Sequence, residues 1–391
     1  MPWKETHVME ERLKFVAQYL DGTWRMTELC RAFGISRRTG YKIVRRYREE
    51  GVSGLSDRSR APLHHPNAVF PAIRNEILLL RDAHGTWGPR KLRAHLAREK
   101  PGLPWPAVST VGEILKRAGK VKPRRRGRRG RAVPSEQPFE DCLGPNDVWC
   151  ADHKGWFRTG DGRRCEPLTI SDAVSRYLLS CLALSGTTWC EAYPVFERAF
   201  LEYGLPLAIR TDNGSPFASK GIGGLTRLAV WWIRLGIVPQ RIQPGRPDQN
   251  GRHERMHRTL KAEACRPPQS NRRTQQGAFD RFREEYNQVR PHEALSDRPP
   301  AEFYVPSPRA YPATLPEVEY PAHFEVRRVR TDGSIKWKGV LYFLSQALRG
   351  QTVGLMSTNE DRWEIHFGRV ALGVLNEHHR KILRHRVLVL T

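Results

Sequence analysis

The segment 146–300 constrains the fold of this chain most, because its pattern changes between strands and helices. Three apolar runs have the length and composition of consecutive strands: 148–152, 167–170 and 177–184. A helical pattern follows over Thr188–Tyr203, and a fourth strand over Leu207–Thr211. This order predicts an α/β domain over residues 145–305.

Length and charge indicate several domains and a polyanionic partner. A chain of 391 residues exceeds what one hydrophobic core usually organises, so we expect two to four domains. The 66 Lys and Arg residues exceed the 41 Asp and Glu residues, which gives a net charge of +25. Such an excess favours phosphate binding through counterion release, so nucleic acid is the expected partner.

Other protein classes fit the sequence less well. No run of 18 apolar residues and no signal-peptide core is present, so we expect a cytoplasmic protein without a membrane partner. The seven cysteines include no C-x-x-C pair, which argues against a disulfide framework and a common zinc finger.

Three acidic residues stand in or beside apolar elements and are candidates for catalysis and metal binding: Asp152, Asp212 and Glu254. Two divalent cations about 3.5–4 Å apart need acidic oxygens, and together they hold the attacking and leaving oxygens of a phosphoryl transfer. Oxygen ligands favour Mg²⁺ or Mn²⁺ over zinc. We therefore expect two Mg²⁺ or Mn²⁺ ions per active site.

The segments around these carboxylates resemble a known family. Asp-Asn-Gly-Ser-Pro-Phe at 212–217 and His-Glu-Arg-Met-His-Arg-Thr-Leu-Lys-Ala-Glu at 253–263 are similar to DDE transposases and retroviral-type integrases, in particular IS481-like (IS3-related) insertion-sequence transposases. The resemblance implies an RNase H-like fold. In that fold the first aspartate lies on strand one, the second ends strand four, and the glutamate lies on a later helix.

The third carboxylate has a competitor in Asp248. Between it and Asp212 lie 35 residues, the spacing often associated with the superfamily, whereas 41 residues lie between Asp212 and Glu254. We assign Glu254, because Asp248 follows a proline before the helix begins and the family's glutamate follows an Asn-Gly pair, here Asn250-Gly251. His253 and His257 have the spacing of the H-E-x-x-H zinc motif, but no third zinc ligand is evident in the sequence, so we do not assign a zinc site.

Arg258 and Lys261 follow Glu254 by four and seven residues and share its helical face. They are candidates for DNA phosphate contacts, and the alternative is an ordinary solvated basic face.

Residues 1–60 have the pattern of a helix-turn-helix domain. Two helical segments precede a turn at Gly34, and Ser36 is a candidate N-cap for a third helix. That helix would enter the major groove with these side chains on its polar face: Arg37, Arg38, Thr39 and Lys42. The alternative is the solvated face of a structural three-helix bundle.

Residues 61–120 have a similar helical pattern and are predicted to form a second helix-turn-helix-like domain, in which Lys91 and Arg93 are candidate DNA contacts. A purely structural bundle is the alternative. Residues 121–144 form a basic linker that either follows a DNA groove or is a solvated tether. Its candidate DNA contacts are Arg124, Arg125, Arg126, Arg128 and Arg129.

Residues 320–391 contain five short strand patterns and predict a small SH3-like β-barrel. Integrase-like proteins carry such a barrel for DNA binding or subunit contacts.

Together these features predict a transposase. It would bind the terminal inverted repeats of a mobile element in double-stranded DNA, cleave the 3′ ends with metal and join them to target DNA, as at least a dimer. One alternative is a catalytically inert DNA-binding regulator. Another is an IS21-like transposase or integrase that needs an ATPase helper.

Overall fold

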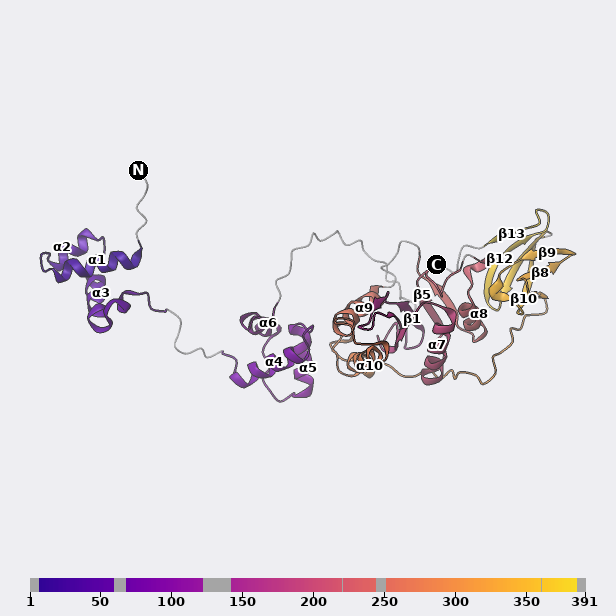
Figure 1. Ribbon diagram of the computed structural model, residues 1–391, viewed down its shortest axis with the longest axis horizontal. Coiled ribbons are helices and arrows are strands. Elements are labelled where there is room, and N and C mark those ends of the chain that lie inside the picture. Colours follow the sequence, from indigo (N-terminus) through magenta and orange to yellow (C-terminus); the bar gives the residue numbers. More distant parts are fainter. Residues whose placement is uncertain are drawn as a thin grey trace. The chain divides into compact units, whose positions relative to one another are not determined.

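The computed structural model describes residues 7–59, 68–121, 142–219, 221–243, 251–359 and 361–384. Residues 1–68 form one compact unit and residues 69–391 form a second. Figure 1 shows the order of the helices and strands along the chain. None of the helices described has the length and apolar character needed to cross a membrane.

The N-terminal unit is a bundle of three helices and a closing 3-10 turn: α1 (Val8–Leu20), α2 (Met26–Ala32), α3 (Arg37–Glu50) and Gly51–Leu55. Its core contains Phe15, Leu29 and Val44, all less than 5% exposed. The Ser36 hydroxyl accepts a hydrogen bond from the Thr39 backbone N–H at 3.2 Å, which confirms the predicted N-cap of α3.

A second helical bundle begins the larger unit: α4 (Pro71–Ala83), α5 (Pro89–Glu99) and α6 (Val108–Arg117). Trp87 is fully buried in its core beside Ile77 and Leu92. Val289 at the end of α10 (Arg272–Gln288) packs against the same core. This bundle therefore contacts the α/β domain directly.

The α/β domain contains one six-stranded mixed sheet. Its strands are β1 (Val148–His153), β2 (Phe157–Arg158), β3 (Arg164–Asp172), β4 (Leu178–Leu184), β5 (Ala208–Thr211) and β6 (Val238–Arg241). Strands β4, β3 and β1 pair antiparallel, whereas β1, β5 and β6 pair parallel. The three antiparallel strands and β5 confirm the strand order predicted from the sequence.

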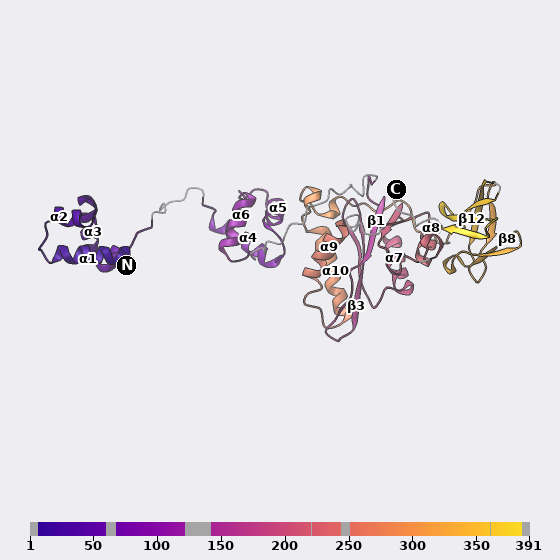
Figure 2. The same ribbon diagram turned by 90° about the horizontal axis from the view of Figure 1, so that it is seen from above.

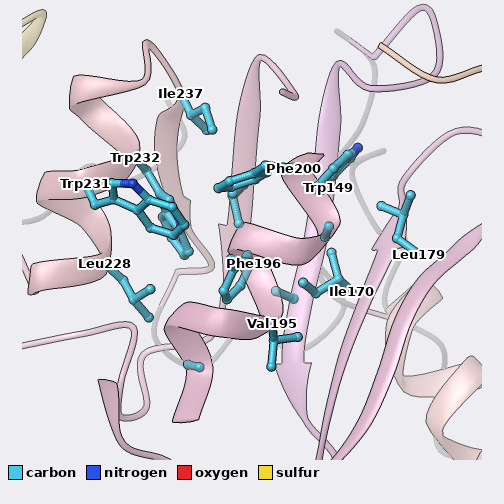
Figure 3. Packing of buried hydrophobic residues seen from close by; sticks show 14 of the residues in the cluster. Trp149, Ile170, Leu179, Val195, Phe196, Phe200, Leu228, Trp231, Trp232 and Ile237 are labelled. Atoms are coloured by element: carbon cyan, nitrogen blue, oxygen red, sulfur yellow. The ribbon is translucent and has the colours of Figure 1, made fainter. Parts of the chain in front are cut away.

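Helices cover both faces of this sheet (Figure 2). On one face, α7 (Trp189–Tyr203) and α8 (Arg227–Arg234) pack against side chains of β1, β3 and β5. Figure 3 shows Phe196 and Phe200 from α7 beside Trp231 and Trp232 from α8 in this core. On the other face, α9 (Gly251–Glu263) and α10 pack against β3 and β4.

The C-terminal region is rich in strands: β7 (Glu325–Arg328), β8 (Ser334–Trp337), β9 (Val340–Phe343), β10 (Thr352–Asn359), β11 (Arg362–Phe367), β12 (Val370–Asn376) and β13 (Lys381–Arg384). Five of them form the sheet β13-β12-β11-β10-β7, and β8 pairs with β9. Both sheets are open, so the predicted closed barrel is not confirmed. Ala229, Val230 and Ile233 of α8 pack into the core of this region.

Candidate active site

Asp152 lies near the end of β1 and faces α9. Because side chains alternate across a strand, Trp149 and Ala151 point into the core under α7, whereas Asp152 points to the opposite face. Asp152 is paired directly with Thr169 of the antiparallel neighbour β3. Its side chain is 17% exposed, so the carboxylate is largely shielded from solvent.

Asp212 follows β5 immediately and lies beside Asp152. The parallel strands β1 and β5 pair Ala151 with Thr211. Asp152 and Asp212 each follow one residue of this pair, so they lie at neighbouring positions. The loop after Asp212 is anchored, because the Asn213 side-chain amide donates to the Ile242 carbonyl at 2.9 Å and Phe217 is buried.

Glu254 lies in the first turn of α9 and its side chain is exposed. The opposite face of α9 packs against the sheet, and His253 and His257 are buried there. The Arg252 guanidinium also donates to the Ala173 carbonyl at 2.8 Å, which ties the start of α9 to the end of β3.

Electrostatics connects the three carboxylates. Burial raises the pKa of Asp152 to about 7, and the negative charges of Asp212 and Glu254 contribute to the same shift. A carboxyl group resists ionisation when like charges surround it in a poorly hydrated site. A divalent cation would relieve that repulsion, and an all-oxygen donor set suits Mg²⁺ or Mn²⁺.

Two hydroxyl groups that were not predicted from the sequence lie beside the site. The Thr169 hydroxyl lies 2.7 Å from Nε2 of both His253 and His257, and the Ser171 hydroxyl lies 3.0 Å from Nδ1 of His253. Burial lowers the pKa of His253 to about 3, so this imidazole is neutral. The four-residue spacing of the histidines indicates that they share one face of a helix. The hydroxyl groups that they contact become apparent only from the register of β3.

The candidate DNA contacts of α3 lie at the surface of the N-terminal unit. Arg37, Arg38 and Lys42 are exposed, and the Thr39 hydroxyl lies 2.9 Å from the Ser36 hydroxyl. Thr39 is therefore part of the helix cap as well as a member of the polar face.

The two candidates on α5 differ in their surroundings. Arg93 is exposed, and its Nε donates to the Pro106 carbonyl at 3.0 Å. Lys91 is half-buried; burial and the nearby Arg290 lower its pKa to about 8, while Glu263 opposes the shift. Its place against the α/β domain favours a packing role over a DNA contact.

Arg258 and Lys261 are exposed on α9, as expected for residues that could meet a phosphate backbone. Asp248 and the five linker arginines lie outside the described residues: Arg124, Arg125, Arg126, Arg128 and Arg129.

Known families match the regions that carry these features. The family described as Integrase core domain matches residues 143–247 and, in a second form, residues 235–300. A Helix-turn-helix domain family matches residues 11–62, and a Homeodomain-like domain family matches residues 39–115.

Two relatives cover most of the chain. It is 26% identical over 259 residues to the "Insertion element IS476 uncharacterized 39.2 kDa protein" of Xanthomonas euvesicatoria, which is 65% of this chain and 72% of that protein. It is 29% identical over 251 residues to the "Insertion element IS407 uncharacterized 31.7 kDa protein" of Burkholderia multivorans, which is 63% of this chain and 86% of that protein. These matches support a DDE transposase of the IS3-like type. The transposase binds DNA and catalyses DNA integration as a polynucleotidyl transferase.

Two integrase structures are among the solved structures that align with the chain. The HTLV-2 integrase catalytic core domain in complex with magnesium is 20% identical and aligns over 42% of the transposase and 99% of that chain, with a TM-score of 0.33. A simian T-cell lymphotropic virus intasome chain is 18% identical and aligns over 76% of the transposase and 97% of that chain, with a TM-score of 0.36.

Proposed function

We propose that Asp152, Asp212 and Glu254 are the catalytic carboxylates of this transposase and that they hold two Mg²⁺ or Mn²⁺ ions. One observation carries the assignment: the parallel strands β1 and β5 pair Ala151 with Thr211, which places Asp152 beside Asp212. The charge of Glu254 on α9 acts on the same Asp152 carboxylate, so the three carboxylates share one site. When bound, such cations stabilise the charge on the attacking and leaving oxygens of a phosphoryl transfer.

The proposed substrate is the pair of terminal inverted repeats of a mobile element. In the first step the oxygen of water attacks the phosphorus at the element end, the bond from phosphorus to the 3′ oxygen breaks, and a 3′-hydroxyl is released. In the second step that 3′ oxygen attacks a phosphorus of target DNA, and a target 3′-hydroxyl leaves. Each step forms one P–O bond and breaks another at the same phosphorus, and the leaving 3′ oxygen takes up a proton, so no covalent protein intermediate is needed.

Several surfaces are proposed to hold the DNA. Arg37, Arg38 and Lys42 on α3 present exposed donors suited to base edges and phosphates. Arg258 and Lys261 on α9 lie on the helix that carries Glu254, so they are placed to contact phosphates near the reacting bond. The linker arginines would add sequence-independent contacts.

The domain arrangement of this proposal has five parts. Residues 1–60 and 61–120 are the two helix-turn-helix domains, 121–144 the basic linker, 145–305 the catalytic core and 320–391 the SH3-like region. Pairing two element ends needs at least two active sites, so the active form is at least a dimer. The SH3-like region would support DNA binding or subunit contacts.

A cleavage assay tests the proposal. Purified protein and the Asp152→Asn variant are incubated with labelled candidate element ends and Mg²⁺, with EDTA as a control. The proposal predicts nicked ends only with metal and the intact aspartate, and unchanged end binding by the variant. Cleavage by the variant would refute the site, and bound but uncut DNA with every end and either metal would favour the inert regulator. A strict requirement for ATP and a partner protein would favour the IS21-like version.

A further inference from the structure

Four buried polar side chains lie between β3 and α9, next to the carboxylates: Thr169, Ser171, His253 and His257. They are 0%, 8%, 1% and 7% exposed, respectively. Here they are called the hydroxyl–histidine hub. Polar groups so deeply buried cost stability unless they are paired, and these are paired mainly with one another.

The centre of the hub is the Thr169 hydroxyl. It lies 2.7 Å from Nε2 of each histidine and 3.1 Å from the backbone carbonyl oxygen of Asp152. The carbonyl oxygen can only accept, so the one hydroxyl proton is donated there when all three contacts are made. The hydroxyl then accepts from both imidazoles, which fixes both as Nε2–H tautomers.

The hub joins the elements that carry the first and third carboxylates. Thr169 is the direct cross-strand partner of Asp152 and contacts its backbone. His253 and His257 are four residues apart on the buried face of α9, and Glu254 follows His253 directly. Nδ1 of His257 lies 3.7 Å from Oδ2 of Asp152. The Thr169 hydroxyl thus connects the backbone of Asp152 to the helix that carries Glu254.

A metal ion is a weaker explanation for this cluster. Asp152, His253 and His257 offer ligand atoms within 4.8 Å of one another. However, both ring nitrogens of His253 already lie at hydrogen-bonding distance from hydroxyl groups, and a cation there would have to displace Thr169 or Ser171.

We propose that Thr169, His253 and His257 are positioning residues of the transposase: the hub sets the separation of Asp152 and Glu254 and thereby the affinity of the site for its divalent cations. This inference rests on the assignment of the two carboxylates as metal ligands. Groups that orient metal ligands without touching the metal typically change metal affinity or activity by about 10–100-fold when they are removed.

The test compares Thr169→Val, which removes the hydroxyl at nearly constant shape, with Thr169→Ser, which keeps it. The first readout is Mn²⁺ binding to the DNA-free, full-length protein, followed by electron paramagnetic resonance. The second is cleavage of a labelled element end, separated into kcat and KM for DNA. We expect Thr169→Val to bind Mn²⁺ about 10-fold or more weakly and to lose kcat with little change in KM, whereas Thr169→Ser stays near wild type.

A second pair protects the test against a folding failure. His257→Leu removes the ring, and His257→Gln is its control because the glutamine amide can reach the Nε2 position. If Thr169→Val does not fold, the comparison of His257→Leu with His257→Gln tests the proposal in its place. Wild-type Mn²⁺ binding and kcat in Thr169→Val or His257→Leu would overturn the proposal, as would equal losses in a variant and its control. Cleavage by Asp152→Asn would instead refute the catalytic carboxylates themselves.

Discussion

Burial and neighbouring negative charges disfavour ionisation of the Asp152 carboxyl group. It is largely buried, and two further carboxylates act on it, so its pKa of about 7 lies far above the value of 3.8 that it has without these influences. Clustered carboxylates of this kind commonly lower the stability of the folded protein, because charges that could bind a metal ion repel one another when no metal is bound.

The raised pKa predicts how pH affects the stability of the metal-free protein. The folded state retains the Asp152 proton up to about pH 7, whereas the unfolded chain loses it near pH 4, so stability falls as pH rises from about 4 to about 7 and the loss is complete above pH 7. Asp152→Asn removes this loss. We expect its melting temperature in EDTA to exceed that of the wild type by about 2–4 °C at pH 8, the shift that ~1 kcal/mol produces, and the difference to shrink towards pH 5.

The control for this prediction is Glu284→Gln, which neutralises an exposed carboxylate on α10. It should leave the pH dependence unchanged. An Asp152→Asn variant that melts at or below the wild-type temperature at pH 8 would contradict the placement of the carboxylate among like charges.

Gly214 is the residue whose lack of a side chain matters to Asp212. A Cβ atom at position 214 would lie 2.9 Å from the Asp212 carboxylate, so Gly214→Ala must displace it. Because a misplacement of about 1 Å can cost about 100-fold, we expect cleavage to fall at least 10-fold with end binding intact. Gly144→Ala is the matched control, since a Cβ there meets nothing within 4 Å. Equal activity of the two variants would show that the loop does not position Asp212.

At the scale of single elements, α9 has two functional faces. The buried face carries the histidines of the hub, and the exposed face carries Glu254, Arg258 and Lys261. The exposed residues were predictable from the sequence, because helical spacing and the acidic motif are local. The contacts of His253 and His257 could not be predicted from the sequence. They are made with Thr169, which lies more than 80 residues earlier and is brought to the histidines by the register of β3.

The exposed face of α9 gives a prediction about DNA binding. Each phosphate contact contributes about 0.9 to the slope of log affinity against log salt, so Arg258→Ala with Lys261→Ala should lower that slope by about 2. Element-end titrations by fluorescence anisotropy at several salt concentrations measure it. Arg281→Ala removes an exposed arginine from the neighbouring helix α10 and serves as the comparison. An unchanged slope in the α9 double variant would remove these residues from the DNA path.

Strand β6 shows why some elements escaped the sequence analysis. It is only four residues long, Val238–Arg241, and contains Pro239, which cannot donate a ladder hydrogen bond. Such a strand is tolerated because it lies at the edge of the sheet beside β5. By contrast β1, β3 and β4 have long apolar runs that the sequence identifies directly.

At the scale of the whole larger unit, the bundle α4–α6 is docked on the α/β domain. Arg90 donates to Glu293 at 2.6 Å and to Asp297 at 2.9 Å, and Nδ1 of His84 lies 2.9 Å from Glu285. The sequence predicted the helices of this bundle but not these contacts, because the partners are about 200 residues apart. Burial of Lys91 is a consequence of the same docking.

A double-mutant cycle can measure this docking. Arg90 and Asp297 are both partly exposed, so the pair should contribute only weakly to stability. We expect the destabilisation by Arg90→Ala and Asp297→Ala to be less than additive in chemical denaturation, by a small but measurable amount. Lys116 and Glu113 form an ion pair within α6, so a double-mutant cycle on them is a control that is independent of docking. Strict additivity for Arg90 and Asp297 would show that the two regions are not docked through this pair in solution.

The central claim is that Asp152, Asp212 and Glu254 act together, and the most direct measurement concerns the third of them. Joining of a pre-cut element end to plasmid DNA is measured in Mg²⁺ for the wild type, Glu254→Gln and Asp248→Asn. We expect Glu254→Gln to bind the end but to join it no better than the wild type does in EDTA, and Asp248→Asn to remain active. Joining by Glu254→Gln together with its loss in Asp248→Asn would contradict the assignment of the site.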